Sequence, residues 1–201
     1  MKSKETMLRV PYALSVHDRK EARAVVRVIN EHRTALGKET AQFESDVARL
    51  FGKKYGIMVN SGSSANLLAF EVLSLPRGAE VITPVLTFST TVSPMLHQGL
   101  VPVFVDVRPK TYLVDIDQVE RRITKKTRAL MIPSLIGNVP DMARLRKIAR
   151  RHRLFFIEDS CDTLGATFKG KPTGAFSDIS TTSFYGSHVI NALGGGGMIC
   201  V

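Results

Sequence analysis

The chain has 201 residues and a net charge of +10, with 44% apolar and 23% charged residues. Its length is enough for one domain with a substantial core, and its composition is that of an ordinary globular protein. The sequence contains no run of eighteen apolar residues, which a membrane span would need, and its N-terminus lacks the apolar stretch of a signal peptide. We therefore expect a cytoplasmic protein. Cys161 and Cys200 are too few for a disulfide framework or an all-cysteine metal cluster.

The positive charge is densest in one predicted helix, whose basic residues are Arg144, Arg146, Lys147, Arg150, Arg151 and Arg153. A basic surface can bind nucleic acid or phosphorylated small molecules. No helix-turn-helix, zinc-finger or RNA-binding signature accompanies the cluster, so nucleic-acid binding is a distant alternative. Leu145 and Ile148 mark an apolar stripe between the basic residues, and we interpret the cluster as the solvated face of an amphipathic helix.

Apolar periodicity predicts helices and short strands in alternation along the chain. In the first half, the predicted elements are helices over 18–34 and 39–51, a strand over 57–60, a helix from 61 to 73, a strand over 80–83, a helix over 89–98 and a strand over 101–106. In the second half, they are a helix over 115–123, a strand over 129–133, a helix over 142–152, a strand over 154–159, a small hairpin over 167–172 and strands over 179–185 and 198–201.

This alternation predicts an α/β fold, in which a mainly parallel sheet is covered by helices on both faces. Ligands of such sheets bind at the carboxyl ends of the strands, which is where candidate site residues are sought. Residues 1–35 are expected to form an N-terminal helical segment and residues 36–201 one large domain. Because the chain ends on a predicted strand with no closing helix, we expect it to be the first part of a larger protein.

The segment Asn60-Ser-Gly-Ser-Ser-Ala-Asn66 links a predicted strand to a predicted helix. Free N–H groups and the helix dipole at such a turn favour a phosphate, and the hydroxyls of Ser63 and Ser64 add donors. Gly62 lets a ligand approach the backbone. An ordinary serine N-cap explains the same residues, so this segment alone leaves both interpretations open.

Two further candidates lie at the carboxyl ends of predicted strands. Asp159 ends the strand over 154–159, where its carboxylate can hold a proton on a heterocyclic nitrogen, as pyridoxal chemistry requires; a helix or turn cap is the alternative. Ser183-Phe-Tyr-Gly-Ser-His188 comes before a run of four glycines, and its hydroxyls can bind phosphate. His188 on its own is also compatible with a structural histidine. The glycine run fits neither nucleotide-binding loop pattern.

In order and spacing, the segments NSGSSANL, TPVLTF, FVDV, IEDSCDTLGA and SFYGSH…GGGGM resemble the DegT/DnrJ/StrS sugar aminotransferase family of fold-type-I pyridoxal-phosphate enzymes. The resemblance runs from about Val10 to the C-terminus and corresponds to the first half of a family member. It implies a three-layer α/β/α large domain that is incomplete here, with the C-terminal small domain missing. It also implies a homodimer.

The resemblance assigns roles by position. It implies that Gly62, Ser63, Ser64 and Ser183 bind the phosphate of pyridoxal 5′-phosphate or pyridoxamine 5′-phosphate. Phe88 would stack on the pyridine ring, for which plain core packing is the alternative. Asp159 would pair with the pyridine nitrogen. Asp162 falls where aminotransferases usually carry a glutamine near the phenolic oxygen.

His188 falls on the lysine that holds the cofactor covalently in most members. This exchange resembles the nucleotide-sugar 3-dehydratase branch, which uses pyridoxamine phosphate, and it implies that His188 is a catalytic base. The implied substrate is a nucleotide-linked 4-keto-6-deoxysugar, with glutamate or a reductase as co-reactant. A sugar aminotransferase using another lysine, such as Lys169 or Lys171, and a noncatalytic sugar-nucleotide-binding protein are the alternatives.

Overall fold

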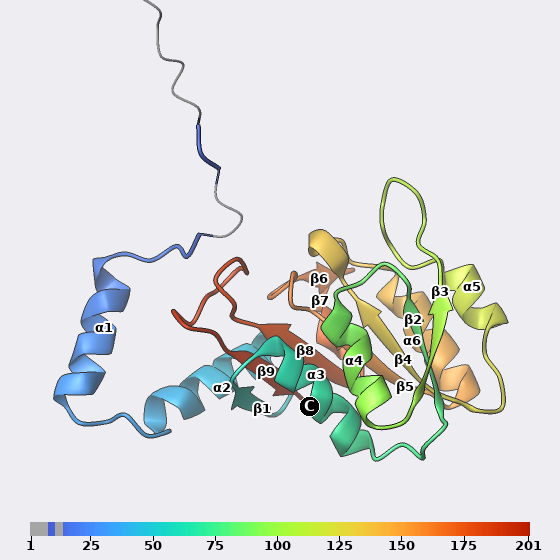
Figure 1. Cartoon of the computed structure of the whole chain (residues 1–201), viewed down its shortest axis with the longest axis horizontal. Coiled ribbons are helices and arrows are strands. Elements are labelled where there is room, and N and C mark those ends of the chain that lie inside the picture. The colour runs from blue at the N-terminus through green and yellow to red at the C-terminus, as the bar shows by residue number, and fades with distance from the viewer. Residues whose placement is uncertain (1–7, 11–13) are drawn as a thin grey trace, which may run out of the picture.

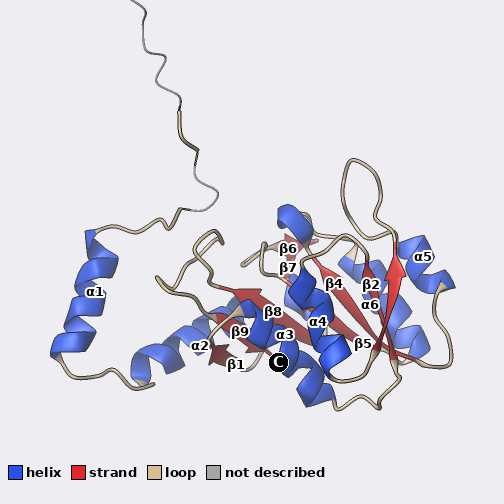
Figure 2. Cartoon of the chain, viewed as in Figure 1, coloured by secondary structure: helices blue, strands red, loops and turns tan. Residues whose placement is uncertain are grey.

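The computed structural model describes residues 8–10 and 14–201. Within them the chain forms a seven-stranded sheet with helices on both faces (Figure 1), which confirms the predicted α/β fold. Helices and strands alternate along most of the chain (Figure 2). No helix in the part of the chain that the structure describes is long and apolar enough to cross a membrane.

The helices are α1 (Arg19–Asn30), α2 (Lys38–Leu50), α3 (Gly62–Leu73), α4 (Ser89–His97), α5 (Ile116–Arg121) and α6 (Met142–His152), with 3₁₀ turns η1 (Leu135–Gly137) and η2 (Thr173–Ala175). The strands of the sheet are β1 (Gly56–Val59), β2 (Glu80–Pro84), β3 (Val101–Val105), β4 (Thr127–Pro133), β5 (Phe155–Asp159), β8 (Ile179–Ser183) and β9 (Gly197–Cys200). The predicted small hairpin is confirmed as β6 (Thr167–Phe168) and β7 (Lys171–Pro172).

Most predicted elements are confirmed to within two or three residues, and α6 has the predicted bounds. The helix predicted over 18–34 is too long: α1 ends at Asn30, and His32 has a φ of 53°, a left-handed conformation that breaks the helix. The helix predicted over 115–123 is shorter because Asp115 is its N-cap and accepts a hydrogen bond from the Asp117 N–H. The parts of the predicted segment 1–35 that fall on residues 1–7 and 11–13 lie outside the described residues.

The strand order is β1-β9-β8-β5-β4-β2-β3. Strands β3, β2, β4, β5 and β8 are parallel, whereas β9 is antiparallel to both β8 and β1. Since β9 returns between them, β1 runs in the same direction as the parallel strands. The carboxyl ends of six strands therefore lie along one edge of the sheet.

Alternating side chains of β4 divide the core into two layers. Leu130 and Ile132 belong to a buried cluster with residues of α5 and α6, whereas Ala129 and Met131 belong to a cluster with residues of α3 and α4. A third cluster holds α2 against β9 and against Phe184, the residue after β8. The predicted three-layer arrangement is thus confirmed, because each face of the sheet buries its own helices.

Helix α1 does not contribute to these clusters. None of its residues is buried, and Val25, Val26 and Ile29 are exposed. It lies apart from the sheet at the left of Figure 1. A helix with an apolar stripe and no buried residue gains its stability from packing against another surface.

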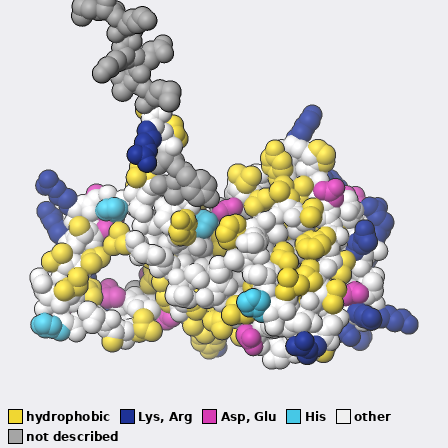
Figure 3. All heavy atoms as spheres, viewed as in Figure 1, with side chains coloured by type: hydrophobic (Ala, Val, Ile, Leu, Met, Phe, Trp, Pro, Cys, Tyr) yellow, Lys and Arg dark blue, Asp and Glu magenta, His cyan; other side chains and the backbone are white. Residues whose placement is uncertain are grey.

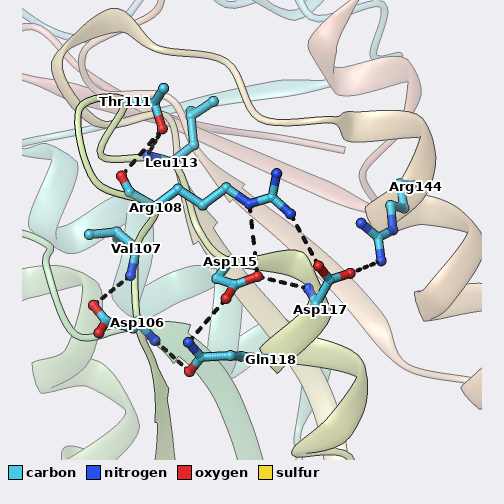
Figure 4. Close-up of polar contacts among 9 residues, drawn as sticks. All are labelled: Asp106, Val107, Arg108, Thr111, Leu113, Asp115, Asp117, Gln118 and Arg144. Carbon is cyan, nitrogen blue, oxygen red and sulfur yellow. Dashed lines mark hydrogen bonds and ion pairs between the residues drawn. The ribbon is translucent and has the colours of Figure 1, made fainter.

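The basic cluster lies on the solvent side of α6, where Lys147 and Arg150 are exposed. Lys and Arg side chains of the chain also gather at the right-hand edge of the molecule in Figure 3. Three of its arginines pair with acids: Arg144 with Asp117 (Figure 4), Arg146 with Asp178, and Arg151 with Glu120. Leu145 and Ile148 are buried on the opposite side. The interpretation as a solvated face of an amphipathic helix is confirmed.

Glu158 is a fully buried carboxyl in β5, next to Asp159 but directed to the other face of the sheet. Its Oε1 accepts a hydrogen bond of 3.2 Å from the Thr173 hydroxyl, while Oε2 has no partner among the described residues. The ammonium group of Lys53 is bound instead by the carbonyls of Ser177 and Asp178, at 2.8 and 2.9 Å. Burial raises the pKa of Glu158 to about 7, although the Thr173 hydroxyl and the charge of Lys53 oppose this.

We expect Glu158→Gln to remove a pH dependence of stability that belongs to this carboxyl. The unfolded glutamate has a pKa of about 4.3, so between that pH and about 7 the folded carboxyl is protonated while the unfolded one is ionised. The stability that Glu158 gives to the folded protein is therefore complete below the pKa of the unfolded glutamate. It is lost as the pH rises through the pKa of the folded carboxyl.

Urea denaturation at about pH 5.5 and about pH 8 measures this effect. The wild-type protein should lose on the order of 2 kcal/mol more unfolding free energy between these pH values than Glu158→Gln. The control Glu71→Gln, at an exposed position on α3, should behave like the wild type. Equal losses in the wild type and in Glu158→Gln would contradict the expectation.

Candidate functional site

A cleft of about 560 Å³ lies at the carboxyl ends of the strands. Its lining residues come from five segments: 61–63 and 86–91, which follow β1 and β2, and 133–135, 159–162 and 183–188, which begin with the last residues of β4, β5 and β8. Each segment lies at the carboxyl end of a strand that points the same way, so the direction of the strands brings together residues that are far apart in the chain.

Seven of the eight residues predicted from the sequence line this cleft. They are Gly62, Ser63, Phe88, Asp159, Asp162, Ser183 and His188. Ser64 is not among the lining residues.

The N-terminus of α3 presents free donors to the cleft. Ser61 is the N-cap, and its Oγ accepts a hydrogen bond of 3.1 Å from the Ser64 N–H. The Gly62 and Ser63 N–H groups have no acceptor among the described residues, and Ser63 is exposed. A serine thus caps the helix, and the two remaining N–H groups are available to an anion; phosphate binding here stays a prediction.

Gly62 has a packing role that the sequence did not indicate. A Cβ atom at this position would lie 2.7 Å from the Ser183 Cβ and 3.0 Å from the Cys161 Sγ. The start of α3 therefore touches the ends of β5 and β8, which only a residue without a side chain permits.

Asp159 lies at the base of the cleft and is held by three donors. Its Oδ2 accepts hydrogen bonds from Asn66 Nδ2 at 2.9 Å and from the Thr91 hydroxyl at 3.0 Å, and its Oδ1 accepts one from the Cys161 N–H at 3.2 Å. Asn66 in turn accepts a hydrogen bond of 2.6 Å from the Thr181 hydroxyl. These contacts fix the carboxylate and leave Oδ1 with a lone pair for a further N–H donor.

Asn66, Thr91 and Thr181 were missed in the sequence. The available signal was polarity at buried positions: Asn66 interrupts the apolar residues of α3, and Thr181 belongs to a run of hydroxyl residues in a strand that is wholly buried. Buried polar side chains need partners, so such positions indicate a hydrogen-bond network.

His188 and Asp162 meet across the cleft, with His188 Nδ1 3.4 Å from Asp162 Oδ1. The other carboxylate oxygen, Oδ2, accepts a hydrogen bond of 2.9 Å from the Ile136 N–H. The role implied for Asp162, beside the phenolic oxygen of a cofactor, stays a prediction. Nearby, burial raises the pKa of the Cys161 thiol, which makes it a poor nucleophile at neutral pH.

The set of groups in the cleft fits a phosphorylated, aromatic heterocycle. Phe88 is 68% exposed at the rim, so its ring is available for stacking and is not part of the core. The buried hydroxyl of Ser134, which the sequence did not single out, has no partner among the described residues and lines the cleft. With the free N–H groups of α3 and the carboxylate of Asp159, the cleft offers a place for each part of a pyridoxal-type cofactor.

The described part of the cleft wall contains no lysine. Lys169 and Lys171 are exposed on the β6–β7 hairpin, and the ammonium group of Lys169 lies 5.3 Å from the centre of the Phe168 ring. Neither is in a position to hold a ligand of the cleft.

A sequence model of the DegT/DnrJ/EryC1/StrS aminotransferase family matches residues 16–201. The chain belongs to this family. It is 42% identical, over 90% of its own length and 41% of the relative, to dTDP-4-dehydro-2,6-dideoxy-D-glucose 3-dehydratase of Saccharopolyspora spinosa. It is 37% identical to GDP-perosamine synthase of Caulobacter vibrioides, over 83% of the chain and 44% of the relative.

Among solved structures, the chain resembles the GDP-4-keto-6-deoxy-D-mannose-3-dehydratase of E. coli with bound hydrated PLP. The TM-score is 0.91 and the identity 34%, over 97% of this chain and 51% of that one. The chain thus spans about half the length of the relatives it matches. The similarity confirms both the family that the motifs indicated and the fold.

We expect Gly62→Ala to destabilise the protein by about 1–3 kcal/mol, because the added methyl group overlaps Ser183. Alanine otherwise forms helices better than glycine by about 0.5–1 kcal/mol. A lower unfolding free energy in Gly62→Ala would therefore come from the steric overlap and not from helix propensity. Gly194→Ala is the matched control, since no heavy atom lies within 4 Å of its added Cβ. Denaturant unfolding measures both, and equal stabilities would show that the packing of Gly62 is not tight.

Proposed function

We propose that the protein containing this chain is a pyridoxamine- or pyridoxal-phosphate-dependent enzyme that removes the C3 hydroxyl of a nucleotide-linked 4-keto-6-deoxyhexose. The observation that carries the proposal is the residue at position 188: a histidine faces the cleft where the family resemblance expects the cofactor-binding lysine. The absence of any lysine from the described cleft wall and the similarity to two 3-dehydratases support it.

Different residues of the cleft bind different parts of the cofactor. The N–H groups of Gly62 and Ser63 and the hydroxyl of Ser183 bind the phosphate at the positive end of α3. Phe88 covers one face of the ring. Asp159, oriented by Asn66 and Thr91, holds the proton on the ring nitrogen.

When bound, the cofactor supplies an amine that condenses with the 4-keto group of the sugar, and a protonated ring that withdraws electrons. His188 is the base: its imidazole would accept a proton and then return it to the C3 hydroxyl, which leaves as water. A histidine performs this transfer without holding the cofactor covalently, which distinguishes the reaction from amino-group transfer through a lysine.

A sugar aminotransferase is the second candidate, favoured by the similarity to the relative named GDP-perosamine synthase. It requires a lysine from outside the described cleft wall. A noncatalytic sugar-nucleotide-binding protein is the third, and it predicts ligand binding with no spectral change of the cofactor.

The proposed partners are a second copy of the chain and, as co-reactant, either glutamate or a reductase. The uncovered apolar stripe of α1, with Val25, Val26 and Ile29 exposed, supports a homodimer because it is available to another surface. We place the enzyme in the cytoplasm, where the free thiols of Cys161 and Cys200 are stable.

A borohydride trap tests the role of position 188. The protein is loaded with pyridoxal phosphate, reduced and analysed by intact mass and peptide mapping. We expect no stoichiometric adduct on the wild type, and one adduct at position 188 in His188→Lys, because reduction fixes only a cofactor attached to a lysine.

Each other outcome has a definite meaning. A stoichiometric adduct on a lysine of the wild type would overturn the dehydratase proposal and favour the aminotransferase. An unmodified His188→Lys variant that still binds the cofactor would show that residue 188 does not lie beside the reactive carbon. Assay of the sugar product, for lost water or gained nitrogen, separates the two reactions directly.

A further inference from the structure

The imidazole of His188 has one ring nitrogen directed to the protein. Its Nδ1 lies 3.4 Å from Asp162 Oδ1, whereas its Nε2 takes part in no hydrogen bond or ion pair among the described residues. His188 follows β8 and Asp162 follows β5, two neighbouring parallel strands. Closing the distance by ~0.4 Å would give an ordinary N–H···O hydrogen bond.

Asp162 is itself held in place from the opposite side. Its Oδ2 accepts the Ile136 N–H at 2.9 Å. Ile136 has φ 56° and ψ 29°, a left-handed conformation that costs a β-branched residue about 1–2 kcal/mol, and its side chain is 68% exposed. Burial of the Ile136 side chain therefore does not explain this strain. The strain is explained by the Ile136 N–H group, which this conformation directs toward Asp162.

The turn that contains Ile136 is tied to the loop after β3. Asn138 donates a hydrogen bond of 3.0 Å to the carbonyl of Thr111. That loop is closed by Arg108, which contacts Asp115 and Asp117, and Asp117 also pairs with Arg144 of α6 (Figure 4). Asp162 is thus positioned through a turn that is anchored to the rest of the fold.

The position of a carboxylate decides which nitrogen of a neutral imidazole carries the proton. A carboxylate accepts hydrogen bonds and does not donate them, so the nitrogen that faces it is the protonated one. With Nδ1–H directed to Asp162, Nε2 carries no proton and is the nitrogen able to act as a base.

We propose that Asp162 is the positioning residue of His188: it holds the imidazole in the Nδ1–H tautomer and so keeps Nε2 free to accept the proton. This inference rests on the proposed function of His188 as the base. It also gives Asp162 a role different from the contact with the cofactor that the family resemblance implied.

Asp162→Asn is the most informative variant because the asparagine has a single acceptor oxygen. The Ile136 N–H can be satisfied only by that oxygen, which turns the amide NH₂ group toward His188. Nδ1 must then accept a hydrogen bond, and the proton moves to Nε2. Asp162→Glu keeps two acceptor oxygens and should retain the original tautomer.

Long-range ¹H–¹⁵N NMR of the ¹⁵N-histidine-labelled protein, without cofactor and at a pH where the ring is neutral, identifies the tautomer. The chain has 5 histidines, and the spectrum of His188→Gln assigns the signal by its loss. We expect Nδ1–H in the wild type and in Asp162→Glu, and Nε2–H in Asp162→Asn. The control Asp106→Asn removes the same charge outside the cleft lining and should leave the tautomer unchanged.

An Nε2–H tautomer in the wild type, or an Nδ1–H tautomer that persists in Asp162→Asn, would overturn the proposal. The wild-type spectrum decides this even if Asp162→Asn does not fold. In the enzyme assay, Asp162→Asn should lower kcat by about 10²–10⁴-fold with little change in KM. Because the tautomer is measured without turnover, a failed dehydratase assay would overturn the proposed function and leave this result standing.

Discussion

The hydrogen bonds around Asp159 hold the cleft together. Asn66 from α3, Thr91 from α4 and the Cys161 N–H converge on one buried carboxylate at the end of β5, and Thr181 from β8 secures Asn66. These hydrogen bonds join two helices and two strands at a single carboxylate. Removing one donor would leave a polar group buried and unsatisfied, which costs about 1–3 kcal/mol, so the network makes the geometry of the site part of the stability of the fold.

The antiparallel direction of β9 is the second constraint on the geometry of the cleft. Because β9 runs antiparallel between β8 and β1, the carboxyl ends of β1 and β8 lie at the same edge, and the phosphate-binding turn faces the loop that carries His188. Gly197 permits this arrangement, since a Cβ there would lie 2.3 Å from the Ser61 carbonyl carbon. Within the glycine run after His188, Gly197 thus serves the close packing of two strand ends.

Much of the site could be predicted from the sequence because its residues follow strands. A parallel sheet places every strand end at one edge, so Gly62, Asp159 and His188 could be grouped without knowing the strand order. The family resemblance supplied the roles. The partners of these residues could not be found in the same way: Asn66, Thr91 and Ser134 are common polar residues whose meaning depends on which side chain lies opposite, and the orientation of Asp162 depends on a turn 26 residues earlier in the chain.

The sequence by itself determined the alternation of helices and strands, the amphipathic faces and the family, since each depends on local periodicity or on ordered motifs. It indicated a histidine in place of the lysine without saying what surrounds it. Only the tertiary structure decided that β9 is antiparallel, that no lysine lines the described cleft wall, and that His188 lies beside Asp162. The physical reason is that these facts concern the distance between segments far apart in the chain, which side-chain packing between strands and helices sets and local sequence does not encode.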